Sequence, residues 1–203
     1  MNVSTVYLKR GATGELVEAS LADEVTDAHL SLWDNTWSPV MQAYCANRTL
    51  TDKPEDHHWD WRQKAGWWRP LLGYRSFALL CRNELQGLML ASDFKSARLQ
   101  AQFGKPVVYV EFLATAPWNR PELEKPTRYR GIGTVMIAAA VEMSFESGYR
   151  GRVALHSLPA AEPFYLESCK MTELGKDAAH HHLMYFEMTS TQAEAFRQKP
   201  SAS

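Results

Sequence analysis

The sequence predicts an α/β protein with a mixed, mostly antiparallel central sheet and helices on both faces of that sheet. The first observation is the order of the expected elements, which is strand, helices, three strands, helix, strand, helix and two strands. The second is residues 107–114, which are β-branched, aromatic and almost continuously apolar, as in a central strand. The third is the apolar stretch that begins at Thr134 and ends at Gly148, which is typical of a helix with a glycine stop.

The first fifty residues predict a hairpin followed by helices. Residues 3–8 are expected to form a strand, residues 11–14 a glycine-bracketed turn, and residues 16–17 the start of a return strand. We expect a helix to begin with Ser20 as its N-cap, because Asp23 follows at the spacing of a capping box. Pro39 can break or restart that helix.

The next segment, residues 49–70, is polar and unusually rich in tryptophan. Pro54 suits an early helix position, and His57 and His58 lie among carboxylates. No His-x-x-x-His spacing occurs here, so the pattern favours a surface helix anchored by tryptophans over a metal site. These tryptophans either line a substrate cleft or seal the core under a loop.

The remaining elements follow from hydrophobic runs and breakers. Strands are expected at residues 77–81 and 88–91, around a turn at 82–87. A proline-punctuated loop is expected at 117–126. Further along, the sequence predicts strands at 152–156, 171–174 and 183–187, helices at 160–169 and 189–197, and a loose tail at 199–203.

Composition indicates one globular domain spanning residues 1–203, with an elaborated tryptophan-rich half at 1–105 and a core at 106–189. The formal net charge of −1 does not favour nucleic acid or a membrane surface as a partner. Three cysteines without metal spacing argue against a disulfide framework. With no signal peptide or spanning segment recognised, we expect a cytoplasmic protein.

Residues 128–134, Arg-Tyr-Arg-Gly-Ile-Gly-Thr, predict an anion site. Two glycines spaced by one residue allow a tight bend, and the helix that follows offers unpaired N–H groups and the positive end of its dipole. The site therefore suits a phosphate or pyrophosphate. The Lys-Ser/Thr pair of a P-loop and the third glycine of a dinucleotide fingerprint are both missing; a plain turn with a helix cap is the alternative.

The pattern Arg/Gln-x-x-Gly-x-Gly resembles the pyrophosphate loop of the GNAT superfamily, the acyl-CoA-dependent N-acyltransferases. Residues 113–117 resemble the end of that family's fourth strand, and Phe164-Tyr165 resembles the Phe-Tyr pair of its fourth helix. The resemblance covers roughly residues 107–187, and the expected element order agrees with it. It implies acetyl-CoA as cosubstrate, held by the loop, by strand backbone and by one polar side chain. The implied contacts are Leu113, Ala114, Thr115, Arg128, Tyr129, Arg130, Gly131, Ile132, Gly133, Thr134 and Ser157.

Two residues are candidates for the proton transfers of amine acylation. Glu111 is a lone carboxylate in an apolar strand, which suits a general base, and its position matches a glutamate of some aminoglycoside-type members. It can instead bind a cationic amine by charge or point away from the sheet. By resemblance, Tyr165 protonates the leaving thiolate, since a phenol is protonated at neutral pH; an aromatic packing role is the alternative.

The sequence departs from the family pattern at Ser157, where an asparagine is usual, and at Lys170, where a glycine is expected. No metal site is predicted, and a covalent route through Cys169 is disfavoured because nothing places a base beside it. The leading hypothesis is an N-acetyltransferase that acts on a small-molecule or peptide amine by direct attack. A homodimer is one assembly that this hypothesis allows. A non-catalytic acyl-CoA-binding or partner-docking subunit and an aminoacyl-tRNA-acetylating toxin are the alternatives.

Overall fold

The protein is described here from a computed structural model that covers residues 2–198. Met1 and the predicted loose tail at 199–203 lie outside the described residues. Within that range the chain forms two compact units. The first contains residues 2–72, 76–88 and 114–132, and the second contains residues 73–75, 89–113 and 133–198. The predicted single domain stays a prediction.

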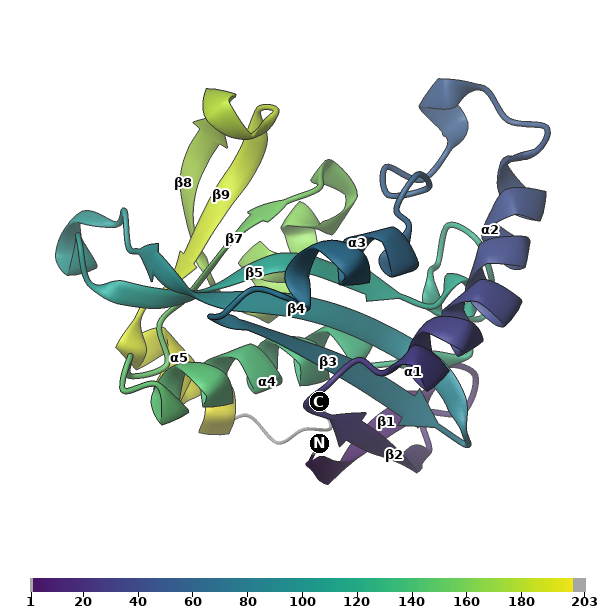
Figure 1. The fold of residues 1–203 in the computed structure, drawn as a ribbon, viewed down its shortest axis with the longest axis horizontal. Helices are drawn as coiled ribbons and strands as arrows, with labels where there is room; N and C mark the ends of the chain where they lie inside the picture. Colours follow the sequence, from purple (N-terminus) through teal and green to yellow (C-terminus); the bar gives the residue numbers. More distant parts are fainter. Residues whose placement is uncertain (1, 199–203) are drawn as a thin grey trace. The chain divides into compact units, whose positions relative to one another are not determined.

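The described strands form one mixed sheet in the order β6-β1-β2-β3-β4-β5-β7-β9-β8 (Figure 1). The pairing of β5 with β7 is parallel, whereas β1 with β2, β1 with β6, β2 with β3, β7 with β9 and β8 with β9 are antiparallel. The strands are β1 (Val3–Arg10), β2 (Leu16–Ala22), β3 (Tyr74–Cys81), β4 (Glu84–Ser96), β5 (Pro106–Thr115), β6 (Tyr129–Arg130), β7 (Val153–Ser157), β8 (Thr172–Asp177) and β9 (Leu183–Met188).

Helices connect these strands, and several of them are short. None of the described helices is both long and apolar enough to cross a membrane. The α-helices are α1 (Asp27–Leu32), α2 (Ser38–Cys45), α3 (Trp61–Trp68), α4 (Ile132–Glu146) and α5 (Ser190–Gln198). Two π-helical turns occur at Trp33–Trp37 and Phe164–Ser168, and short 3₁₀ turns occur at Leu50–Asp52, Gln100–Gln102, Pro117–Asn119, Pro159–Ala161 and Ala178–His180.

The first predicted helix was wrong at its start. Ser20 does not cap a helix, because it lies inside β2 and pairs with Thr5 on one side and Leu80 on the other. The N-cap is Thr26, whose side chain accepts from the backbone N–H of His29 while the His29 ring accepts from the Thr26 N–H. Strand pairing on both edges of β2 outweighs a local capping signal.

The predicted turn at 82–87 is shorter than expected. Arg82 and Asn83 have φ values of 53° and 61°, so they form a two-residue hairpin of the kind that requires positive φ at both central positions. As a result β4 begins at Glu84 and runs for 13 residues. The predicted helix at 160–169 is also replaced by a 3₁₀ turn and the π-helical turn Phe164–Ser168.

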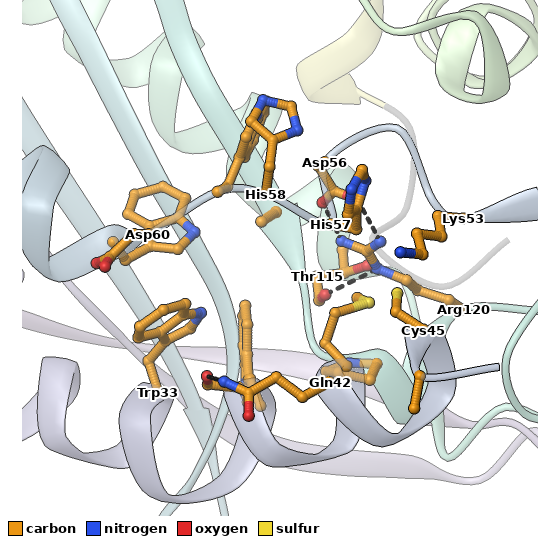
Figure 2. Close-up of a pocket in the computed structure, with 18 residues that line it drawn as sticks. Trp33, Gln42, Cys45, Lys53, Asp56, His57, His58, Asp60, Thr115 and Arg120 are labelled. Atoms are coloured by element: carbon orange, nitrogen blue, oxygen red, sulfur yellow. Dashed lines mark hydrogen bonds and ion pairs between the residues drawn. The ribbon is translucent and has the colours of Figure 1, made fainter. Parts of the chain in front are cut away.

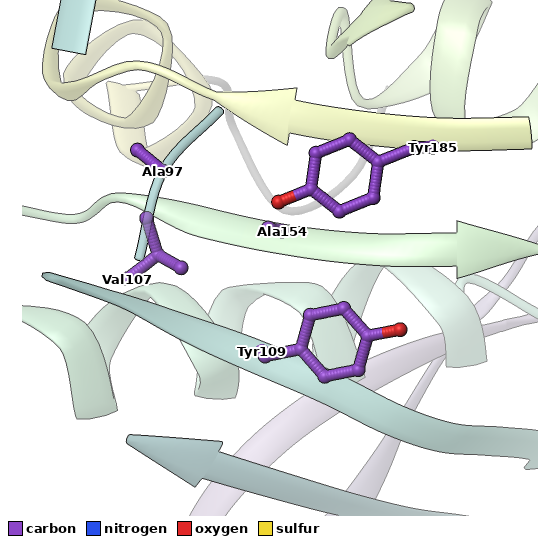
Figure 3. Close-up of a cluster of buried hydrophobic side chains, with 5 residues drawn as sticks. All are labelled: Ala97, Val107, Tyr109, Ala154 and Tyr185. Carbon is purple, nitrogen blue, oxygen red and sulfur yellow. The ribbon is translucent and has the colours of Figure 1, made fainter. Parts of the chain in front are cut away.

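The second unit has a core built on its strands and helices. Tyr109 and Tyr185 lie on either side of Ala154, with Ala97 and Val107 in the same cluster, and this cluster joins β5, β7 and β9 (Figure 3). The two helices of this unit, α4 and α5, lie side by side and are linked by an ion pair of 2.7 Å between Glu142 and Arg197 (Figure 1). The predicted stop at Gly148 is confirmed by its φ of 76°.

Lys170 occupies a left-handed position, with φ of 57°. It follows Cys169, the C-cap of the turn Phe164–Ser168, and the N–H of Met171 donates to the Tyr165 carbonyl at 3.0 Å. This is the geometry of a helix end that normally carries glycine, because a Cβ is strained there. The backbone turn expected from a glycine is therefore present although the residue is lysine.

We predict that Lys170→Gly stabilises the protein by up to about 1 kcal/mol, since relief of left-handed strain outweighs the added entropy of glycine in the unfolded chain. The matched control is Lys176→Gly in β8, which should destabilise the protein because Lys176 has no positive φ and pairs with Met184 of β9. Thermal unfolding of the two variants measures the difference. Equal destabilisation by both substitutions would contradict the assignment.

Candidate functional site

The parallel ladder between β5 and β7 is short. It contains three pairs, from Val108 opposite Val153 to Val110 opposite Leu155. β7 continues to Ser157, and its next residues pair with β9 on the opposite side. From Glu111 and His156 onward the two strands are thus no longer ladder partners.

Glu111 lies at the first position of β5 beyond this ladder. Ser92 of β4 donates a hydrogen bond of 2.8 Å to its Oε1. Burial raises the pKa of Glu111, although the Ser92 hydrogen bond and the positive charges of Lys95 and His180 act in the opposite direction. A partly buried carboxylate with a raised pKa has a greater affinity for a proton, which is what a general base requires.

The predicted phosphate loop contains a short strand before its helix. Tyr129 donates its backbone N–H to Asn119 Oδ1 at 2.8 Å, and Arg130 is the ladder partner of Lys9. Fewer of the loop's backbone N–H groups are therefore left for an anion than the sequence predicts, because Tyr129 and Arg130 are engaged within the protein. Among residues 2–198, no hydrogen bond is made by the backbone N–H groups of residues 131–134, at and just before the start of α4.

The two glycines of the loop are required for different reasons. Gly131 has φ of 94°, and a Cβ added there would meet open space, so it is needed for its backbone conformation. Gly133 would place a Cβ 2.9 Å from Cζ of Phe164. The first turn of α4 therefore packs directly against Phe164, and the two motifs recognised in the sequence depend on each other.

Tyr165 is buried, with its ring between those of Phe164 and Phe186 at centroid distances of 5.1 and 5.8 Å. Burial raises its pKa, and the neighbouring Cys169 thiol acts in the same direction. The phenol thus retains its proton at neutral pH, as a proton donor must.

Several of the remaining predicted contacts are already engaged. Arg128 forms an ion pair of 2.9 Å with Glu84 and lies over the Trp118 ring. The Thr115 carbonyl accepts from Arg120 Nε at 3.1 Å. Ser157 is buried, and its hydroxyl donates to the neighbouring Leu158 carbonyl at 2.8 Å. No ion pair is made by Arg130 among the described residues. Of the two loop arginines, Arg130 is therefore the one that can meet an anion without first leaving a carboxylate.

A cavity of about 440 Å³ lies in the first unit (Figure 2). It is bounded by α2, the segment that precedes α3, and the end of β5. Four tryptophans line it, namely Trp33, Trp37, Trp59 and Trp61. The polar groups that line it include Lys53, Asp56, His57, His58, Asp60, Thr115 and Arg120. The tryptophan-rich segment therefore does line a cleft, which was one of two alternatives for it, and Trp61 is also part of the core.

A buried ion pair holds one wall of this cavity. Arg120 donates through both Nη atoms to the two carboxylate oxygens of Asp56, at 2.7 Å for the Nη1–Oδ1 pair. The side chains are 12% and 10% exposed. With its third donor on Thr115, Arg120 fastens the segment around Asp56 to the end of β5 (Figure 2). The two residues are 64 positions apart, so no local sequence signal could have revealed the pair.

No protein-family model and no curated protein matches this sequence. Solved structures do resemble it. RimJ from Mycobacterium smegmatis, in complex with CoA-disulfide, superimposes with a TM-score of 0.58 at 13% identity, over 99% of this chain and 91% of RimJ. A Desulfovibrio desulfuricans protein described within the GNAT family gives 0.55 at 12% identity, over 85% of this chain and 99% of that one.

A third structure is yncA from Salmonella typhimurium with its cofactor acetyl-CoA, which gives a TM-score of 0.51 at 13% identity over 85% of this chain and 94% of yncA. The chain has the GNAT acetyltransferase fold. This confirms the fold class predicted from the sequence. At such low identity the likeness concerns the fold, and the roles of individual residues depend on the local geometry described above.

One further polar cluster in this GNAT fold joins β5, β7 and the end of β8. Tyr109 and His156 Nδ1 share a hydrogen bond of 2.5 Å, and His156 Nε2 lies 3.1 Å from Asp177. His180 Nδ1 lies 3.0 Å from the same oxygen of Asp177, which Arg98 also contacts. Burial lowers the pKa of His156 to about 4.

The donor atoms of His156, Asp177 and His180 lie within 4.8 Å of one another, a spacing that metal ions use. The two imidazole rings, however, are stacked 4.0 Å apart at an angle of 7°. A metal ion lies in the plane of each histidine that binds it, and two parallel planes share no such point. We therefore interpret the cluster as a set of structural hydrogen bonds that link β5, β7 and the end of β8. The absence of a metal site stays a prediction.

The contact between Gly133 and Phe164 can be tested with two glycine variants. We predict that Gly133→Ala destabilises the protein by about 1–3 kcal/mol, because the added methyl group overlaps the Phe164 ring. Gly66→Ala in α3 is the control, since nothing lies within 4 Å of its Cβ position and alanine favours helices, so it should stabilise by up to about 1 kcal/mol. Urea unfolding measures both values. If Phe164→Leu does not relieve the Gly133→Ala loss in the double variant, the contact is not its cause.

The buried pair of Arg120 and Asp56 should matter more than an exposed pair of the same type. We predict that Asp56→Ala costs about 3 kcal/mol or more, because it leaves Arg120 charged and buried without its partner. The control is Asp34→Ala, which breaks the exposed pair with Arg62 and should cost less than about 1 kcal/mol. Thermal unfolding in parallel measures the two. Similar losses would show that burial does not determine the effect.

Proposed function

We propose that the protein is an N-acetyltransferase that transfers an acetyl group from acetyl-CoA to a primary amine by direct attack. The observation that supports this most is the early end of the parallel ladder at Val110 and Leu155, with Glu111 at the first position beyond it. A strand segment that has left the ladder suits the extended pantetheine arm, which carries amide groups of its own. The GNAT fold and the coenzymes bound in RimJ and yncA agree with this choice.

The diphosphate of the coenzyme is assigned to the loop that ends in α4. Among the described residues, no acceptor meets its backbone N–H groups at residues 131–134, and the start of a 15-residue helix adds a positive dipole end. Arg130 supplies mobile positive charge. The backbone of Leu113, Ala114 and Thr115 is assigned to the pantetheine arm, and the contact from Ser157 is the weakest because its hydroxyl is already used.

The proton balance assigns one residue to each end of the reaction. An alkylamine has a pKa near 10, so at pH 7 roughly one molecule in a thousand is neutral, a deficit of about 4 kcal/mol. Glu111 takes the proton from the amine nitrogen, directly or through water. The nitrogen then bonds to the thioester carbon, the carbon–sulfur bond breaks with its electrons on sulfur, and Tyr165 gives its proton to the thiolate. The nitrogen loses its second proton as the amide forms, and that proton restores the Tyr165 phenol through solvent.

A non-catalytic acyl-CoA-binding module is the competing function. The engaged hydroxyl of Ser157 is compatible with it, because one expected cofactor contact is weakened. The two functions differ in turnover and not in binding, so binding of CoA alone does not separate them.

We predict that wild-type protein releases CoA thiol from acetyl-CoA in the presence of a primary amine, and that Glu111→Gln and Tyr165→Phe each lower kcat by about 10²- to 10⁴-fold. Because burial raises the pKa of Glu111, the acid side of the wild-type profile of kcat/KM against pH should fall at a pH above that of an ordinary carboxylate, as protonation removes the base. A thiol-trapping assay over a broad panel of amines measures this.

The control is Glu173→Gln on β8, an exposed glutamate that should leave kcat unchanged. Calorimetric titration with CoA accompanies each assay. Tight CoA binding without thiol release from any amine would favour the binding module. Full activity of Glu111→Gln would remove Glu111 from the mechanism.

A further inference from the structure

The cavity of the first unit has carboxylates whose charges are already compensated. Asp56 is held at both oxygens by Arg120. Asp60 is the N-cap of α3, where its Oδ1 accepts from the Gln63 N–H at 2.9 Å and its charge meets the positive end of the helix dipole. With Lys53 also in the lining, the cavity holds no excess of negative charge. A polycation that entered this cavity would lose hydration without gaining enough negative charge in return.

Tryptophans supply the apolar part of the lining. Trp37 and Trp61 are buried, and the Trp37 Nε1 is satisfied by the Leu85 carbonyl at 3.0 Å, so these rings form fixed walls. Trp33 and Trp59 are partly exposed and present ring surface to a ligand. Figure 2 places Trp33 on the side of the cavity away from Arg120. Rigid aromatic walls favour a flat apolar body, which they contact over a large area.

The opposite side carries the imidazole ring of His57. His57 Nδ1 lies 2.8 Å from the Pro54 carbonyl, and its backbone N–H donates to the same carbonyl at 2.9 Å. Because a carbonyl oxygen can only accept, Nδ1 carries the hydrogen, and in the neutral ring Nε2 is left with its lone pair. The bond from Nδ1 to the Pro54 carbonyl fixes the ring, so it suits a single N–H group of a ligand.

We propose that this cavity binds the acetyl acceptor as an arylalkylamine, a primary monoamine on a flat aromatic body, in preference to polyamines and amino sugars. The ring lies toward Trp33, and the amine donates to His57 Nε2. The amine then lies at the end of the cavity that contains Thr115, whose strand end is assigned to the thioester arm. This proposal rests on the acetyltransferase function proposed above, but measurements of amine binding test it without any turnover.

The test is calorimetric titration of the full chain with 2-phenylethylamine, n-hexylamine, spermidine and 2-phenylethanol, each with and without saturating CoA. We expect 2-phenylethylamine to bind about fivefold more tightly than n-hexylamine, since aromatic contact adds about 1 kcal/mol beyond area, and more tightly than spermidine. 2-Phenylethanol should also bind less tightly, because it lacks the amine.

Variants locate the binding. Trp33→Leu should weaken 2-phenylethylamine by about tenfold, and His57→Gln by about fivefold. Trp67→Leu is the matched control, because Trp67 lies on α3 outside the cavity lining and is half exposed, and it should leave the affinity unchanged. Far-UV circular dichroism confirms that each variant is folded.

Each outcome decides the proposal. The expected order of ligands, with losses in Trp33→Leu and His57→Gln, supports it. Spermidine binding as tightly as 2-phenylethylamine, equal affinities in Trp33→Leu and Trp67→Leu, or no amine binding in either condition would overturn it. Thiol release with spermidine alone would overturn the substrate class and leave the acetyltransferase function intact. Binding of 2-phenylethylamine without thiol release from any amine would support the cavity as an arylalkylamine site and overturn the acetyltransferase function.

Discussion

The early end of the parallel pairing between β5 and β7 is the constraint on which the functional interpretation depends. After Val110 and Leu155 the two strands no longer share hydrogen bonds, while β7 stays paired to β9 through Ser157. A strand in the middle of a sheet thereby acquires a segment that behaves like an edge. In most sheets an unpaired edge is a liability, but a cofactor with its own amide groups can complete it.

Close packing links the start of α4 to the turn that carries Tyr165. Gly133 in the first turn of α4 meets the ring of Phe164, and Tyr165 follows on the same π-helical turn. The missing side chain at Gly133 therefore determines both how the helix begins and where the aromatic pair sits. Lys170 ends that turn in a left-handed conformation, which keeps the backbone path although the usual residue is absent. Sequence motifs that look independent are thus coupled through a single contact.

The cavity in the first unit shows how charge can be present without being available. Asp56, Asp60 and Lys53 all line it, so composition alone suggests a site for a charged ligand. Hydrogen bonds from Arg120 and from the N-terminus of α3 use the two carboxylates internally. What is left for a ligand is aromatic surface and an imidazole nitrogen.

Residue order by itself determined the fold class, because the apolar run at 107–114, the glycine-bounded helix and the alternation of elements are local patterns with fixed periods. It also predicted a phosphate loop at residues 128–134 and singled out Glu111, since one carboxylate in an apolar strand is visible without coordinates. Tertiary structure alone decided that Ser20 lies in a strand, that Arg130 belongs to the β1 ladder, and that Asp56 pairs with Arg120. Those outcomes depend on partners distant in the chain, whose pairing energy outweighs local propensity and leaves no periodic trace in the sequence.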